Sequence, residues 1–229
     1  MHGPVCVLGS MATRGLLAEL AATWDGNATV RSVGGVEAVR LVREGEPVDV
    51  VVLAASALEK LQAEGLILSG SLAAVVISSM VAAVRTGQAV PVLSDAEDVK
   101  YTVLAAKRIG YSTGPSGDYL LHLLDEWGIR ETIGKRLVQA PPGVPVGQLL
   151  ADGVVELGFQ QCSELINLEG VTVAGPLPRE IAADTVFAAG VVRTTSRLDE
   201  AWRFVRFLSS TETTSTKLRH GLQPAGSAK

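Results

Sequence analysis

Hydrophobic positions along the chain follow two alternating periods. Short apolar runs of the strand type are separated by segments whose apolar residues recur every three or four positions, as on one face of a helix. Within the first 65 residues, strands are predicted over residues 4–10, 28–33 and 48–54, and helices over residues 11–24, 36–46 and 56–65. This strand–helix alternation predicts an α/β fold with a parallel sheet.

The second half of the chain repeats the alternation. Strands are predicted over residues 81–87, 108–111, 135–140, 154–160, 170–178 and 185–192, and helices over 94–107, 118–127, 141–153, 198–210 and 211–221. Strands restart near residue 80, as if a second sheet begins there. We therefore predict two lobes, residues 1–78 plus 193–229 and residues 79–192, joined by a hinge that the chain crosses twice. The tail from residue 222 is expected to be frayed.

Composition excludes several classes of protein. Of the 229 residues, 47% are hydrophobic and 19% are charged, which suits a folded α/β chain with substantial cores. The net charge of −4 and the lack of long basic runs argue against binding to nucleic acid. The chain contains no run of 18 apolar residues, so no membrane-spanning segment is predicted. The N-terminus lacks the pattern of a signal peptide, so the location is cytoplasmic unless a leader has been removed, in which case it is periplasmic.

The two cysteines, Cys6 and Cys162, belong to no Cys/His cluster, so no metal site is predicted. A disulfide between them stays open as an alternative to two free thiols. The chain carries no P-loop, no GxGxxG and no GxSxG, so no cofactor is predicted and Ser-His-Asp chemistry has no local support.

Small polar residues gather where predicted strands lead into helices. In open α/β sheets, ligands bind beyond the carboxyl ends of the strands, where helix N-termini offer free N–H groups to anions. Candidate ligand-binding residues at these junctions are Ser10, Gly35, Ser112, Thr113, Ser116, Gly117 and Val144. Each alone could be an ordinary helix cap, but several that feed one cleft favour an anion site.

Other polar residues add candidate chemistry. Arg85 lies in an apolar strand, where it is either an exposed edge residue or a clamp for a carboxylate. Gln160 ends the strand predicted at 154–160 and Gln161 follows it, and both carry amide groups that can donate to an anion. Glu164 is either a helix-capping acid or a proton-transfer group.

Three longer stretches carry a family resemblance. These are GEPVDVVVLAASALEKLQAEG, IGYSTGPSGDYLLHLLDEWGI and VELGFQQCSELINLEGVTVAGPLP, which begin at residues 45, 109 and 155. They resemble the molybdate-binding-protein-like branch of bacterial type II solute-binding proteins, over nearly the whole chain. The resemblance implies two α/β lobes of the type II periplasmic-binding-protein-like fold, a two-stranded hinge and an anion held in the interlobe cleft.

Carried over by position, Ser10, Gly35, Ser112, Ser116 and the turn at Val144 would surround the ligand. Gln160 and Gln161 would approach it from the second lobe. An ABC transporter permease is the partner that this family implies. One departure concerns the turn after the second strand, where molybdate binders carry serine and this chain reads VGGVEAV.

The YSTGPSG loop is closer to relatives that hold ligands with several carboxylates. We therefore expect a solute-binding protein for a di- or tricarboxylate, and less so for an oxyanion of the molybdate type. The alternative is an enzyme similar to aconitate isomerase, which shifts a double bond in a tricarboxylate by proton transfer. Glu164 and Tyr111 are its candidate catalytic residues, and Tyr119 lies nearby.

Overall fold

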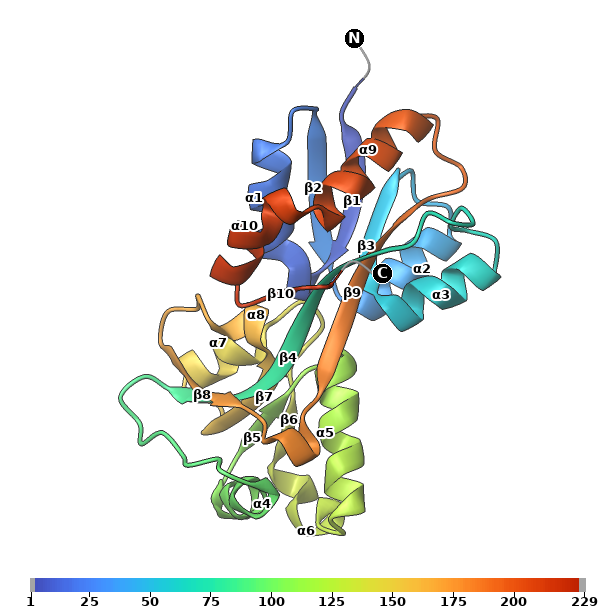
Figure 1. The fold of residues 1–229 in the computed structure, drawn as a ribbon. Helices are drawn as coiled ribbons and strands as arrows, with labels where there is room; N and C mark the ends of the chain where they lie inside the picture. The colour runs from blue at the N-terminus through green and yellow to red at the C-terminus, as the bar shows by residue number, and fades with distance from the viewer. Residues whose placement is uncertain (1–2, 227–229) are drawn as a thin grey trace. The chain divides into compact units, whose positions relative to one another are not determined.

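The computed structural model describes residues 3–226, which divide into two compact units (Figure 1). Unit 1 comprises residues up to Ser78 together with those from Thr185 onward, and unit 2 comprises Ser79–Asp184. The predicted first crossing, between residues 78 and 79, coincides with this division. The return crossing lies eight residues before the predicted one, because residues 187–191 pair with a strand of unit 1.

Unit 1 contains the early strand–helix pairs and the C-terminal helices. Its elements are β1 (Val5–Ser10), η1 (Met11–Thr13), α1 (Arg14–Thr23), β2 (Ala28–Val33), α2 (Gly35–Arg43), β3 (Val50–Ala54), α3 (Ala55–Ala63), the first part of β4 (Ala73–Arg85), nearly all of β9 (Asp184–Val191), α9 (Leu198–Ser209), η4 (Thr211–Thr213), α10 (Thr214–Arg219) and β10 (Gln223–Pro224). Strands β1, β2 and β3 are parallel, as predicted, and β9 runs antiparallel to β3.

Unit 2 contains the remaining elements. They are the second part of β4, α4 (Ala96–Ala105), β5 (Ile109–Tyr111), α5 (Pro115–Glu126), α6 (Arg130–Ile133), η2 (Gly134–Arg136), β6 (Leu137–Gln139), α7 (Val146–Ala151), β7 (Leu157–Gln161), α8 (Cys162–Leu165), β8 (Val171–Pro176) and η3 (Arg179–Ile181). Strands β5, β6 and β7 are parallel, and β4 runs antiparallel to β7.

One hydrogen-bonded path of strands runs in the order β2-β1-β3-β9-β4-β7-β5-β6, with β8 and β10 also paired to β4. The strand expected at 81–87 is the end of a 13-residue strand, whose residues from Met80 onward pair with β7 and β8 of unit 2. The expected fraying of the tail is wrong for its first residues, because Leu222 is fully buried and β10 pairs with β4. Residues 227–229 lie outside the described residues.

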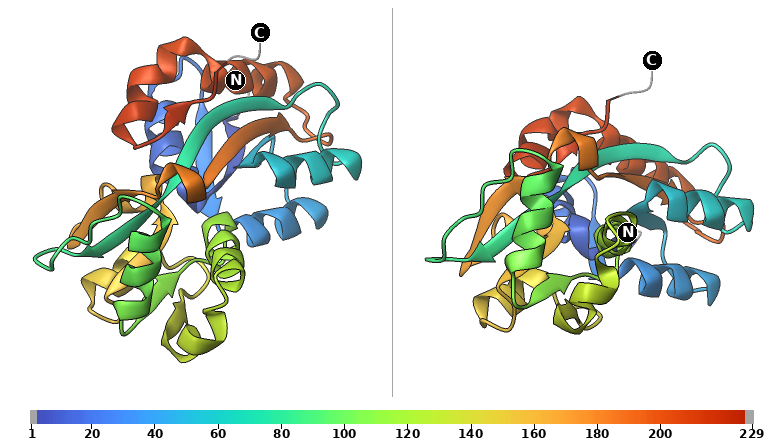
Figure 2. Two further views of the ribbon diagram at one scale, coloured as in Figure 1. Left: turned by 60° about the horizontal axis from the view of Figure 1, so that its bottom comes forward. Right: turned by 90° about the horizontal axis from the view of Figure 1, so that it is seen from below.

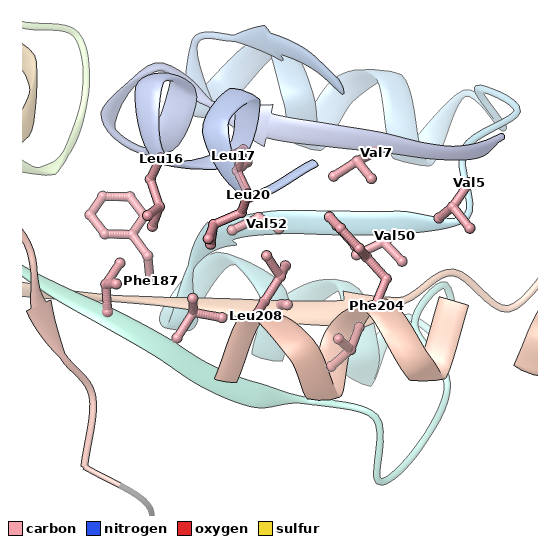
Figure 3. Close-up of a cluster of buried hydrophobic side chains, with 14 of the residues drawn as sticks. Val5, Val7, Leu16, Leu17, Leu20, Val50, Val52, Phe187, Phe204 and Leu208 are labelled. Atoms are coloured by element: carbon pink, nitrogen blue, oxygen red, sulfur yellow. The ribbon is translucent and has the colours of Figure 1, made fainter. Parts of the chain in front are cut away.

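The sheet of unit 1 is covered on both faces (Figures 1 and 2). On one face, Leu16 and Leu17 of α1 pack with Phe204 and Leu208 of α9 against the strands (Figure 3). On the other face, side chains of α2 and α3 form a second cluster with Leu8 and Leu53. Burial of both faces explains why the run at 48–54 is apolar at almost every position.

Unit 2 is built in the same way. Met80, Ala82 and Val84 of β4 contribute to the cluster under α4 and α5, whereas Val81 and Ala83 contribute to the cluster under α7 and α8. Side chains alternate between the faces of a strand, so these five residues show that both faces of β4 are buried. The cores hold the carboxyl ends of β5, β6 and β7 in fixed positions.

Candidate anion site

Three loops of unit 2 leave the sheet at the same edge. Tyr111 pairs with Gln139 of β6 and with Phe159 of β7, so the parallel strands β5 and β6 end level with one another and β7 runs two residues further, to Gln161. The amide of Ala140 donates to the Tyr111 carbonyl at 2.9 Å, which extends this alignment by one residue. Residues 112–116, 140–145 and 160–164 therefore begin side by side, where ligands of open α/β sheets bind.

The loop after β5 brings two predicted serines together. The hydroxyl oxygens of Ser112 and Ser116 lie 3.0 Å apart, and Ser116 is 2% exposed. The amide of Gly114 donates to the Ser112 hydroxyl at 3.2 Å. Thr113, the third predicted hydroxyl of the loop, has an exposed side chain. We call Ser112 and Ser116 the serine pair.

Ser116 lies on the first turn of α5, a helix of 12 residues that begins with Pro115, and Ser112 lies in the loop just before it. The amides of Gly117 and Asp118 both donate to the Gly114 carbonyl. Pro115 has no N–H, and within residues 3–226 no acceptor is found for the amide of Ser116. This turn offers a hydroxyl pair and one amide at the positive end of a helix dipole, which suits an anion.

Gly117 explains the spacing of this motif. A Cβ atom at Gly117 would lie 1.8 Å from the backbone oxygen of Ser112, closer than any two such atoms can approach. The loop therefore folds directly onto the helix only because residue 117 has no side chain. Gly117, predicted as a ligand-binding residue, is buried and holds the serine pair in position.

Gln160 joins the other two loops. Its Oε1 accepts a hydrogen bond from the Val146 amide at 2.7 Å, and its Nε2 donates to Glu164 Oε1 at 2.7 Å. The side chain is 2% exposed. Both polar atoms are thus engaged within the protein, and only the second hydrogen of Nε2 is left for a ligand. Gln160 therefore acts mainly as a brace between the two loops rather than as the predicted ligand donor.

Gln161 is equally buried, and the alternation of side chains places it on the opposite face of β7, the face covered by α5. It therefore lies on the side of the sheet that carries the serine pair. Val144 lies in the loop before α7 with its amide bonded to the Pro141 carbonyl, so only its side chain, 36% exposed, is presented to solvent.

Arg85 is not brought together with these residues. Val81 of β4 pairs with Gln160, and Arg85 lies four residues further along the strand, roughly 13 Å away at about 3.3 Å per residue. It is exposed, and its guanidinium lies near Gly153 beyond the end of α7. The structure thus matches the edge-residue alternative for Arg85.

Glu164 follows β7 in α8 and is partly exposed. Burial raises the pKa of its carboxyl to about 7, and the hydrogen bond from Gln160 opposes that shift only in part. A group with this pKa can both give and accept a proton near neutral pH. Tyr119 donates its hydroxyl to the Ile181 carbonyl, and burial raises its pKa, so it stays a neutral phenol. Tyr111 packs its ring partly buried against the core under α5.

Unit 1 supplies a separate group of hydroxyls at the carboxyl ends of β1 and β2. Ser10 is 6% exposed, and its oxygen lies 3.3 Å from that of Thr13. The Ser32 hydroxyl has no hydrogen-bond partner among residues 3–226, and it faces Gly9, its neighbour in the sheet. Thr13 and Ser32 are not among the residues predicted from the sequence, although Ser32 stands just before the VGG turn.

Gly35 is the first residue of α2, with Gly34 as its cap. A Cβ atom at either glycine would meet no other atom within 4 Å. The N-terminus of α2 is therefore open, and nothing in unit 1 fills the space that serine would take there.

The structure decides between a disulfide and two free thiols, and it shows whether possible metal ligands gather. Cys6 and Cys162 are both free, so the two thiols rather than the disulfide alternative describe the chain. In the described part of the chain, no three His, Cys, Asp or Glu side chains gather in a way that could hold a metal ion. No helix among those residues is long and apolar enough to cross a membrane.

The fold and these loops define a class. Among solved structures, the periplasmic molybdate-binding protein of Azotobacter vinelandii superimposes with a TM-score of 0.82 at 20% identity, covering 97% of this chain and 100% of that one. The binding protein AgtB of A. tumefaciens R10 in complex with agropinic acid gives 0.73 at 13% identity, with 98% and 83% covered. The chain has the type II fold of periplasmic binding proteins, as predicted.

The sequence profile of bacterial extracellular solute-binding proteins matches residues 5–223, and the chain belongs to this family. The family resemblance stated above is thereby confirmed. An aconitate isomerase of Pseudomonas sp is 31% identical over 185 residues, which cover 81% of this chain and 70% of that protein.

Proposed function

We propose that this solute-binding protein holds a small organic anion, a di- or tricarboxylate. The observation that carries the proposal is the serine pair at the start of α5, with the buried Ser116 and its amide on the first turn of the helix. Hydroxyl and amide donors at a helix N-terminus stabilise a carboxylate without a neutralising cation. Within unit 1, Ser10, Thr13, Ser32 and the open N-terminus of α2 at Gly35 are proposed as a second group of anion donors.

Two features favour carboxylates over a compact oxyanion. The turn after β2 carries glycines at 34 and 35, where molybdate binders carry serine. The relative at 31% identity is an aconitate isomerase, a protein that acts on a tricarboxylate. As a member of an extracellular family, the chain is proposed to work in the periplasm with an ABC transporter permease.

The Ser116→Ala variant is expected to bind trans-aconitate more weakly by about 1–2 kcal/mol, the scale of losing a hydrogen bond to a charged group. Titration calorimetry measures this loss. The matched control is Ser94→Ala, which removes an exposed hydroxyl in front of another helix of unit 2 and should leave the affinity unchanged. An unchanged affinity in Ser116→Ala would remove the serine pair from the site.

An isomerase is the second candidate, favoured by the pKa of Glu164 and by the relative's activity. Such an enzyme would use Glu164 to take a proton from one carbon and return one to another, while the serine pair stabilises the enolate-like charge. Incubation with cis-aconitate in heavy water decides the matter. Conversion to the trans isomer by the wild type, abolished in Glu164→Gln, would establish that the protein is an enzyme. Binding without conversion or deuterium uptake would support a binding protein without catalytic activity.

A further inference from the structure

Glu164 belongs to a chain of hydrogen bonds at the same edge of the sheet as the serine pair, on the face of β7 that α7 covers. The Val146 amide donates to Gln160 Oε1, and Gln160 Nε2 donates to Glu164 Oε1, each at 2.7 Å. This chain fixes which way the Gln160 amide faces, because a flipped amide would point its NH2 group at the Val146 N–H. Glu164 Oε1 is thereby the acceptor, and Oε2 is the oxygen free to carry a proton.

The described elements that pack against α8 carry no charge that could compensate that of Glu164. Helix α8 packs against β7, α7 and β8, and the sequences of these elements (LGFQQ, VGQLLA and VTVAGP) hold no titratable residue. The other titratable group of α8 is Cys162, whose thiol is neutral because burial raises its pKa. The flanking acids Asp152 and Glu169 are exposed. The raised pKa of Glu164 thus follows from burial in a neutral setting.

We propose that Glu164 takes up one proton from solvent when the anion binds, so that the protein takes its ligand together with a proton. The inference rests on the proposed function, since it requires an anion at this edge of the sheet. A second negative charge nearby and the loss of water both favour the neutral acid. The step forms an O–H bond at Oε2 and breaks none in the ligand.

Proton uptake fixes the sign of the pH dependence. Well below pH 7, Glu164 is already protonated in the free protein, so binding takes up no proton and the affinity is constant. Above pH 7, the free protein carries the carboxylate, and the affinity falls by up to about tenfold per pH unit.

Titration calorimetry with trans-aconitate in HEPES and in Tris at equal pH measures the proton uptake, because the two buffers release different heats when they ionise. The wild type should take up about half a proton at pH 7, more at pH 8, and close to none at pH 5.5. Glu164→Gln should bind the same ligand with no such uptake, and its affinity should not fall between pH 7 and 8. The control Glu169→Gln removes an exposed acid from the α8–β8 loop and should behave as the wild type.

The possible failures are distinguishable. No binding of trans-aconitate or of the other carboxylates by the wild type would overturn the proposed function and this inference with it. Binding without proton uptake, or uptake that persists in Glu164→Gln, would overturn the inference alone. Should Glu164→Gln fail to fold, infrared difference spectra of the wild type at pH 7.5 still decide. The carbonyl band of a newly protonated acid must appear on binding, and its absence rejects the proposal.

Discussion

Replacing Gly117 with alanine is expected to lower the free energy of unfolding by about 3 kcal/mol, at the upper end of the usual cost of overpacking, and to abolish measurable anion binding. The added Cβ would lie 1.8 Å from the Ser112 backbone oxygen, and a backbone atom cannot move aside as a flexible side-chain end can. The loop must lift away from α5, which separates the serine pair.

Urea unfolding and titration calorimetry together measure this effect. Gly134→Ala is the matched control, because Gly134 has helical backbone angles and an added Cβ there meets no atom within 4 Å. That variant should keep the stability and affinity of the wild type. If Gly117→Ala folds with wild-type stability and binds normally, the close contact between the loop and the helix does not hold the site together.

The Glu164→Gln variant is expected to be more stable than the wild type by about 3 kcal/mol at pH 8 and to lose this advantage as the pH falls below 4.5. The carboxyl pKa is about 7 in the folded protein, against 4.5 for an ordinary glutamate. Between these values the folded protein binds more protons than the unfolded chain, so its stability falls as the pH rises through this window.

Glutamine keeps the oxygen that accepts from Gln160 and has no charge to bury. All other groups titrate alike in the two proteins, so the difference between their unfolding free energies from pH 4 to pH 8 isolates Glu164. Two parallel curves would show that the carboxyl is not desolvated as described, and would also weaken its proposed role in proton uptake.

Much of the fold could be predicted because its signals are local. The apolar run at 48–54 and the helical periodicity at 11–24 each fix one element, and right-handed crossovers then leave few topologies. The strands near the crossings between the two units were harder to assign from the sequence. Apolar residues 185–192 carry no mark of which sheet they join, and only their pairing with β3 assigns them to unit 1. The pairing of β10 depends on a distant strand in the same way.

The candidate site shows the same limit. The hydroxyls at Ser112 and Ser116 are visible in the sequence because they stand four residues apart at a predicted helix start. The reason for Gly117 is invisible, since it depends on where a backbone oxygen lies. Gln160 and Arg85 were predicted from the chemistry of their side chains alone. Burial and hydrogen bonding make Gln160 a brace, and the register of β4 places Arg85 far from the site.

The most direct test of the central claim is a calorimetric panel of citrate, cis-aconitate, trans-aconitate, malonate, molybdate, sulfate and phosphate against the wild type. We expect at least one di- or tricarboxylate to bind clearly more tightly than every inorganic oxyanion, and Ser116→Ala to weaken that binding. Tight binding of molybdate alone, with none of the carboxylates detected, would contradict the account.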